Sequence, residues 1–496
     1  MSTEPGDKPP VADETLGRET IRRRAISGAA FIAGRGVAIL LMAAVANAVI
    51  ARSISPARFG LIAFGVAIMT FASAFADGGL GSALIRSSVP VDEPTLRSVL
   101  GVQLVITSVL YAGIAFVGLE FFGLAGQLTA VMALALPIDS FDTPARIMLE
   151  RSLSYRTLAR VEVLQAAFYY LFSIVVVLAG AGVWGLAAAT VLRSAVGVTL
   201  VFRARRDLFF RPALEISRVR SLLSFGLAFQ GNNFVTVARD QGLNIGIAAI
   251  GGAASLGLWT LSRRLLELPF LLFQTLWRIS FPATSQLMRL ETNLRPMMEK
   301  GVALTAIGTG LILVPMAAGS PGLVPAVFGA RWREVGIVVT ISCAALLVPG
   351  PISVATAGFL YANGQAKAVL WTTVWHTVTW LVVGLGLLPV IGLKAVPIGL
   401  VVGSAVDALL LARATWRLAP VRLFASLLPA SAAGFAGGAV GVACALVLPR
   451  SAAAGALCAV IGEAAYLGLL LLVERRRVLD LFSVVRRVAR DKLAVA

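Results

Sequence analysis

Charged side chains inside long apolar runs are the residues of this chain that could do chemistry. Arg35 lies between Gly34 and Gly36 in the first run, and Asp77 lies near the end of the second. A charge at the centre of a bilayer costs about 2.5–3.5 kcal/mol, so it persists only where a partner or a function offsets that cost. If the first two runs are antiparallel neighbours, Arg35 and Asp77 face each other in the same half of the membrane.

Other apolar runs also contain polar residues, and together they form a candidate set for a substrate cavity. The candidates are Arg35, Asp77, Arg193, Asn232, Asn233, Arg239 and Asp240. Two interpretations stay open: structural ion pairs between helices, or a polar cavity for a charged or polyhydroxylated substrate. Because the planar fork of arginine binds phosphate through two hydrogen bonds, the second interpretation favours an anionic substrate.

The apolar runs themselves define the class of protein. The chain has 496 residues, 58% of them hydrophobic and 14% charged, and its mean hydropathy is +0.88. Runs of about 20 apolar residues, each able to cross roughly 30 Å of hydrocarbon, recur along the whole length. They lack the period of two that marks transmembrane strands. The sequence predicts an all-α polytopic membrane protein, which excludes a soluble nucleic-acid binder despite the net charge of +18.

Fifteen apolar segments are recognisable, and we expect about 14 transmembrane helices. The uncertain segment is 268–287, because it contains Pro269, Arg278 and Pro282. With the N-terminus in the cytoplasm, fourteen spans place 34 of the 43 Lys and Arg residues on the cytoplasmic side and 6 on the other. This asymmetry follows the positive-inside rule, so we predict a multi-pass protein with cytoplasmic N- and C-termini.

The spans are expected to form two pseudo-symmetric lobes plus two C-terminal helices. A shift of 197 residues aligns Ile50-Ala51 with Ile247-Ala248, a weak repeat of the kind that transporters contain. The expected organisation begins with a cytoplasmic N-terminal tail at 1–26, an N-lobe of six helices at 27–202 and a basic cytoplasmic linker at 203–220. A C-lobe of six helices follows at 221–420, and its first spans are expected at 219–238 and 243–262. Two further helices at 421–473 and a basic, amphipathic cytoplasmic tail at 474–496 complete the chain.

No enzymatic or metal site is recognisable in the sequence. Cys343, Cys444 and Cys458 lie inside apolar runs without metal-ligand spacing. The single histidine, His376, lies among tryptophans and is interpreted as part of an interfacial aromatic cluster. No glycine-rich nucleotide loop occurs. We therefore expect a transporter with no catalytic residues, metal or cofactor, and the sequence leaves its coupling ion open between H+ and Na+.

The stretch between the first two runs carries a resemblance to a known family. The signature "LARLLSPEDFGLIA … DLGLGSALI" of bacterial polysaccharide-transport proteins resembles Ile50-Ala-Arg-Ser-Ile-Ser-Pro-Ala-Arg-Phe-Gly-Leu-Ile-Ala and Phe71-Ala-Ser-Ala-Phe-Ala-Asp-Gly-Gly-Leu-Gly-Ser-Ala-Leu-Ile. Shorter matches in the family's order are Gly182-Val-Trp-Gly-Leu, Leu223-Ser-Phe-Gly, Phe328-Gly-Ala-Arg-Trp and Asn363-Gly-Gln-Ala-Lys. Proteins of this family are lipid-linked oligosaccharide flippases of the multidrug/oligosaccharidyl-lipid/polysaccharide exporter superfamily.

The resemblance implies a fold, a cargo and a location. It implies two lobes arranged in a V that alternate access across the bacterial inner membrane. The implied cargo is an oligosaccharide on undecaprenyl diphosphate, such as an O-antigen or exopolysaccharide repeat unit, with the diphosphate meeting cavity arginines. The expected partners are this lipid-linked glycan and membrane lipids, with polysaccharide polymerases and glycosyltransferases as further candidates and no nucleic acid. One departure bears on the site, because Asp240 and Asn244 match the family's "NLDNLLIGRFLG" tract only loosely.

Two other functions compete with the flippase. A multidrug or organic-cation antiporter of the same superfamily would need acids to dominate its cavity, whereas arginines are at least as numerous among the candidates. A polymerase or ligase of surface polysaccharide would need a large periplasmic loop, which the sequence lacks.

The candidate arginines generate a first prediction. Arg35→Ala and Arg239→Ala should each lower transport, because each removes a positive charge from the expected cavity, while the protein still reaches the membrane. Transport assayed beside immunoblots of membrane fractions tests this. Unchanged transport in both variants would contradict a role for these arginines in the cavity.

Overall fold

The computed structural model describes residues 18–86, 91–267, 269–270, 273, 295–449 and 451–475. Every regular element in these ranges is a helix, which confirms the predicted all-α class. Within the same ranges, twelve helices are long and apolar enough to cross a membrane, and one bent pair of helices adds a thirteenth span. Most of the uncertain segment 268–287 lies outside the described residues.

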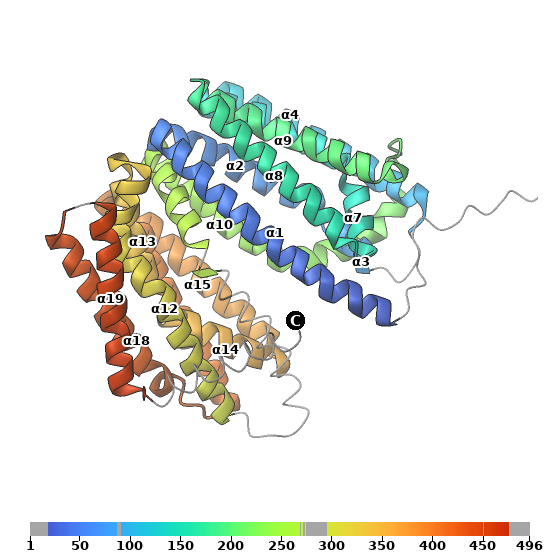
Figure 1. The fold of residues 1–496 in the computed structure, drawn as a ribbon. Coiled ribbons are helices and arrows are strands. Elements are labelled where there is room, and N and C mark those ends of the chain that lie inside the picture. Colours follow the sequence, from blue (N-terminus) through green and yellow to red (C-terminus); the bar gives the residue numbers. More distant parts are fainter. Residues whose placement is uncertain are drawn as a thin grey trace, which may run out of the picture. The chain divides into compact units, whose positions relative to one another are not determined.

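The chain forms two compact units, and the first ends at Ile245. Its elements are α1 (Arg18–Ser53), α2 (Pro56–Asp77), α3 (Leu80–Arg86), α4 (Glu93–Phe121), α5 (Gly123–Ala133), α6 (Ala135–Ser140), α7 (Thr143–Arg151), α8 (Tyr155–Leu178), α9 (Gly182–Ala204), the short η1 (Arg206–Leu208) and the first part of α10 (Ile216–Leu265). Helix α1 packs along α8, and α8 packs along α9 (Figure 1). On the other side of this unit, α5 packs against α2, α4 and α9.

The corner between the first two apolar runs is the α1–α2 turn. Ser55 caps α2, since its side chain accepts a hydrogen bond from the backbone N–H of Arg58 at 3.4 Å. Pro56 takes the first helical position, where its missing N–H costs nothing. Helix α2 ends where Gly78 adopts the left-handed conformation with φ of 50°. Local sequence signals therefore set both ends of this helix.

The connection from α9 to α10 is packed against α4. The backbone N–H of Ala213 donates to the carbonyl of Arg97 at 3.0 Å. Gly101 permits this approach, because a Cβ at that position would lie 1.9 Å from the carbonyl oxygen of Ala213. Leu208 is fully buried in the apolar cluster that joins α3, α4 and α7. We call residues 205–215 the strap.

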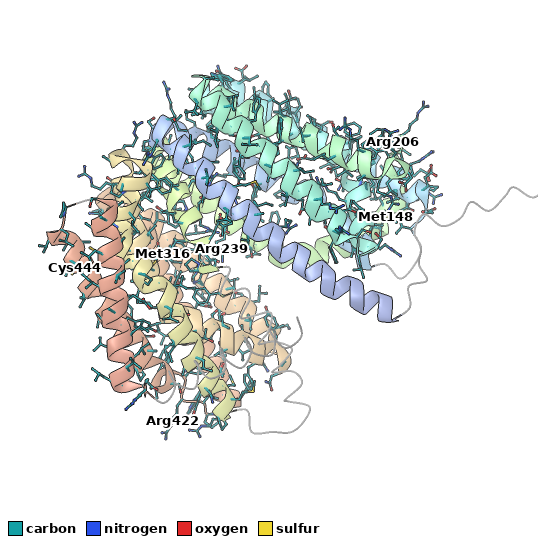
Figure 2. All side chains as sticks on the ribbon, in the orientation of Figure 1. Met148, Arg206, Arg239, Met316, Arg422 and Cys444 are labelled. Atoms are coloured by element: carbon teal, nitrogen blue, oxygen red, sulfur yellow. The ribbon has the colours of Figure 1, made fainter. Side chains whose placement is uncertain are left out.

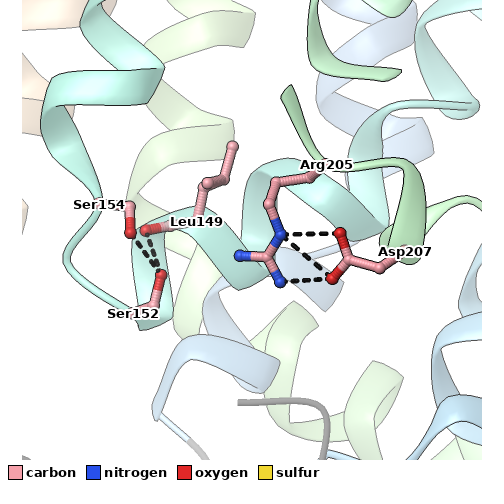
Figure 3. A network of polar contacts seen from close by, with 5 residues as sticks. All are labelled: Leu149, Ser152, Ser154, Arg205 and Asp207. Atoms are coloured by element: carbon pink, nitrogen blue, oxygen red, sulfur yellow. Dashed lines mark hydrogen bonds and ion pairs between the residues drawn. The ribbon is translucent and has the colours of Figure 1, made fainter. Parts of the chain in front are cut away.

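Ion pairs form at both ends of the strap. Arg205 donates three hydrogen bonds of 2.7–3.1 Å to Asp207 (Figure 3). This guanidinium lowers the pKa of the Asp207 carboxyl below its ordinary value. Arg218 likewise pairs with Glu215 at 2.5 Å and with Asp92 at 3.1 Å. Because solvent screens exposed pairs of this kind, the buried side chain of Leu208 does most to hold the strap in place.

Helix α10 departs from the sequence prediction. The sequence predicts spans at 219–238 and 243–262, but the helix runs on through Asp240 and through Arg239, which Figure 2 labels. It breaks at Gly252, where φ is 78° and ψ is 175°. Arg239 and Asp240 remain in the helix because they neutralise each other in an ion pair of 2.8 Å, and glycine accommodates a positive φ at low cost. The division between the two compact units also falls inside α10.

The second compact unit begins at Gly246 and is built on three groups of helices. Its elements after α10 are α12 (Arg295–Phe328), η2 (Ala330–Trp332), α13 (Arg333–Leu346), α14 (Pro349–Ala362), α15 (Ala366–Gly386), α16 (Leu388–Ile391), η3 (Gly392–Lys394), α17 (Ala395–Leu418), α18 (Leu423–Val447) and α19 (Ala452–Val473). Helices α13 and α14 form the bent pair, with an angle of 44° between them. Helix α15 packs along α17, and α12, α18 and α19 lie side by side (Figure 1).

Helices α18 and α19 are integral to the core of the second unit. Their buried residues join α12 and α14 in one hydrophobic cluster. In that cluster the hydroxyl of Tyr466 donates to the carbonyl of Ile307 at 2.9 Å. Gly310 leaves room for this ring, because a Cβ there would lie 2.2 Å from the Tyr466 hydroxyl oxygen. Gly322 of α12 meets Gly455 of α19 in the same way, as small residues at membrane helix contacts do.

The contact at Gly310 generates a stability prediction. Gly310→Ala should destabilise the protein by about 1–3 kcal/mol, since the added methyl overpacks against Tyr466. Gly308→Ala is the matched control in the same helix, because no atom lies within 4 Å of a Cβ at that position. Thermal unfolding in detergent should show a lower Tm for the first variant and not for the second. Equal Tm values would contradict the close packing of α12 on α19.

Candidate functional site

A polar cavity of about 680 Å³ lies within the first unit, among α1, α2, α6, α7, α8 and α9. Its charged lining residues are three arginines and three acids: Arg35, Arg146, Arg193, Asp139, Asp142 and Glu162. The formal charges of the lining therefore cancel. Polar neutral side chains complete the wall, among them Gln165, Tyr169, Tyr170, Thr190 and Ser194. We call this space the N-unit cavity.

An ion pair between α1 and α8 forms one wall of the N-unit cavity. Nη1 of Arg35 donates to Oε2 of Glu162, and the two side chains are 30% and 26% exposed. The Nε of Arg35 is buried and has no hydrogen-bond partner among the described residues. Because α1 packs along α8, the pair compensates both charges at a helix contact. Part of the donor capacity of Arg35 is left over.

A second ion pair lies at the junction of α6 and α7. Nε of Arg146 donates to Oδ2 of Asp142 at 2.7 Å, and the Asp142 side chain is only 3% exposed. Burial raises the pKa of Asp142 to about 6, although Arg146 acts in the opposite direction. In α7, burial and the negative charge of Glu162 raise the pKa of Glu150. Glu150 thus belongs to the same electrostatic neighbourhood without lining the cavity.

Gln165 connects three helices at the centre of the cavity wall. Its Oε1 accepts a hydrogen bond from Nη2 of Arg146 at 3.4 Å, and its Nε2 donates to the carbonyl of Arg193 at 3.1 Å. Gly197 of α9 gives this amide its space, because a Cβ at that position would lie 2.3 Å from Nε2 of Gln165. The amide therefore couples α7 and α8 to the turn of α9 that carries Arg193.

Arg193 differs from the other two arginines of the cavity. Its guanidinium lies 5.7 Å from the centre of the Tyr169 ring, within cation–π range. It is exposed, and no described residue forms an ion pair with it. The next residue, Ser194, lines the same cavity, as does Asp139. Arg193 is therefore the lining cation that is most ready to receive an anion.

The structure brings some of the sequence candidates together and separates others. Arg35 and Arg193 both line the N-unit cavity. Arg239 and Asp240 pair with each other and are not lining residues. The side chains of Asn232 and Asn233 lie outside the described residues.

Asp77 is placed at a helix end. Its Oδ2 accepts the backbone N–H of Gly79 at 3.2 Å in the turn that leads to α3, and it does not line the cavity. The sequence predicts that Arg35 faces Asp77, but the partner that the structure gives Arg35 is Glu162. The reason is that α1 packs along α8, so the neighbour of the first span is not the second one.

Most of the cavity lining is missing from the sequence candidates, including six charged or polar side chains. They are Asp139, Asp142, Arg146, Glu162, Gln165 and Tyr169. Their spacing was the available signal, because the last three recur at i, i+3 and i+7, on one face of a helix. The first three repeat that spacing across the α6–α7 junction.

Comparison with known proteins identifies the family. A family described as "Polysaccharide biosynthesis protein" matches residues 49–337, more than half of the chain. The chain belongs to this family. Apart from Arg35, every lining residue named above falls inside the matched region.

Two relatives of this chain are named for succinoglycan biosynthesis transport and for lipopolysaccharide biosynthesis. The succinoglycan biosynthesis transport protein ExoT of Rhizobium meliloti (strain 1021) is 22% identical over 335 residues, which cover 65% of this chain and 66% of ExoT. The lipopolysaccharide biosynthesis protein WzxC of Escherichia coli (strain K12) is 26% identical over 336 residues, covering 65% and 67%. The chain thus spans about two thirds of the length of each relative. ExoT is described as a transport protein, and WzxC as a biosynthesis protein.

Solved structures show the same fold. The lipid II flippase MurJ, in an inward closed conformation, aligns over 89% of this chain and 98% of its own, with a TM-score of 0.68 and 14% identity. A MATE multidrug resistance transporter of the MOP superfamily, in an inward-facing conformation, covers 78% and 95% with a TM-score of 0.57 and 16% identity. The multi-pass helical fold predicted from the sequence is confirmed.

The space beside Gly197 generates a prediction about the site. Gly197→Ala should displace the Gln165 amide and break its bond to the Arg193 carbonyl, which shifts α9 where it carries that arginine. Transport should fall several-fold, while the amount of protein in the membrane stays normal. Gly113→Ala in α4 is the control, because nothing lies within 4 Å of its Cβ position. If both variants transported equally well, Gln165 would have no role in positioning Arg193.

Proposed function

We propose that this protein is a flippase for an undecaprenyl-diphosphate-linked oligosaccharide, the repeat unit of a cell-surface or secreted polysaccharide. It would move the cargo across the bacterial inner membrane by alternating access. The observation that carries the proposal is a charged cavity enclosed by apolar membrane helices, in a chain of the polysaccharide biosynthesis family. Such a cavity gives a polar headgroup a path that hydrocarbon does not offer.

The lining chemistry suits the head of such a lipid. Arg193 and Arg35 present guanidinium forks, which bind phosphate oxygens in pairs. The amide of Gln165 and the ring of Tyr170 supply hydrogen-bonding and stacking surfaces for sugar hydroxyls and rings. A cavity of about 680 Å³ is in the range of small-molecule pockets, so it fits the diphosphate and the first sugars rather than a long glycan. The lipid tail would stay in the bilayer.

An organic-cation antiporter receives less support from this cavity. Cation binders need an excess of negative charge, whereas the three acids of the lining are matched by three arginines. Two of the three acids, Asp142 and Glu162, are already engaged by arginines.

The orientation proposed from the sequence completes this assignment. Both termini would lie in the cytoplasm, with the basic stretch 203–220 on the same side. The lipid-linked glycan is the proposed cargo, and the enzymes that make and polymerise it are the proposed neighbours.

The function predicts a defined phenotype. Deleting the gene should cause carrier-linked repeat units to accumulate on the cytoplasmic side of the inner membrane, measured by protection of the glycan from periplasmic enzymes. Normal surface polysaccharide without such accumulation would refute the flippase. In complementation, Arg193→Ala should reduce transport about tenfold or more, because it removes a charged hydrogen-bond donor worth about 1.5–3 kcal/mol. Arg203→Ala, an exposed arginine ten residues further along α9, is the control and should complement fully.

A further inference from the structure

Two ion pairs of the N-unit cavity differ in how firmly they are held. The Arg146–Asp142 pair joins residues four positions apart, and its carboxylate is 3% exposed. The Arg35–Glu162 pair joins two different helices, and its carboxylate is 26% exposed. A buried carboxylate that loses its cation is left with an uncompensated charge, whereas a partly exposed one is rehydrated. The Arg35–Glu162 pair is therefore the easier one to open.

We propose that Glu162 acts as an internal substitute for the anionic cargo, occupying Arg35 while the cavity is empty and yielding it to the headgroup on binding. This rests on the proposed function, because it takes the cargo to be a diphosphate. A carboxylate and a phosphate offer the guanidinium the same oxygen pair, so they compete for one site. Arg35 also holds a spare donor at Nε for the larger anion.

The charged groups around Glu162 determine whether Arg35 stays paired with Glu162 or binds the anion. Arg35 faces it from α1, Arg146 and Glu150 lie near it in α7, and Arg193 shares the cavity from α9. In this arrangement Arg193 makes the first contact with an incoming anion, because no described carboxylate pairs with it. Displacement of Glu162 then adds Arg35 as the second contact. Glu162 is thus a specificity residue that sets how strong an anion must be to enter.

Binding of a probe anion to the full-length protein tests the exchange. The protein is placed in phosphatidylcholine nanodiscs at fixed pH and ionic strength, and inorganic diphosphate is titrated by calorimetry. Glu162→Gln should bind about tenfold tighter than the wild type, because the competing charge is gone while Arg35 stays. Adding Arg35→Gln to that variant should abolish the gain.

Glu150→Gln is the matched control. It removes the same charge from the same neighbourhood, yet Glu150 does not line the cavity. Its affinity should stay within about twofold of the wild type, since general electrostatic effects near a surface are small. If the diphosphate affinity of Glu150→Gln rose as much as that of Glu162→Gln, the change in net charge alone would explain the gain. That result would refute the displacement of Glu162 by the anion. Unchanged affinity in Glu162→Gln, or no binding in any variant, would overturn it as well.

A further variant covers the case in which Glu162→Gln does not fold. Glu162→Asp keeps the charge and shortens the side chain, so the pair loosens and diphosphate affinity should rise by a smaller factor. Affinity equal to or below that of the wild type would refute the exchange. The flippase function is decided separately by the accumulation of carrier-linked repeat units, so the failure of one proposal is distinguishable from the failure of the other.

Discussion

A charge inside a bilayer needs compensation, and the organisation of the first compact unit follows from that constraint. Arg35 finds its carboxylate on α8, which ties the first helix to the middle of the unit. Arg146 compensates Asp142 at the α6–α7 junction, and Gln165 links that junction to α9. The interactions that make charged side chains tolerable are the same ones that hold the helices around a polar space. Stability and the existence of the polar cavity are therefore not separate properties here.

Features that depend on nearby residues were predictable from the sequence. The length and apolar character of the runs define the all-α membrane class, and Ser55 with Pro56 marks a helix start through groups within three residues. The partner of Arg35 was not predictable in this way. Glu162 lies 127 residues away, and only the packing of α1 along α8 selects it over Asp77. Pairing inside a bundle depends on which helices touch, and that is a property of the whole fold.

In α10, two adjacent charges lie inside a helix where the sequence predicts a break between two spans. Arg239 and Asp240 have the composition of a loop, but neighbouring opposite charges neutralise each other and remain in a helix. The actual break at Gly252 had no polar signal, since it depends on a backbone angle that glycine tolerates. This chain shares the fold of a solved structure although the two sequences are only 14% identical. Many different sequences can supply apolar runs of the required length and close helix contacts.

The strap between α9 and α10 determines where this chain could be divided into fragments. Composition alone would suggest a cut in the basic stretch 203–220. Such a cut would separate Leu208 and Ala213 from one another or from α4, which they cover. It would also assign the first half of α10 to the wrong fragment, because that half belongs to the first compact unit. A gene split, a circular permutation or an inserted reporter would therefore damage a packed surface there.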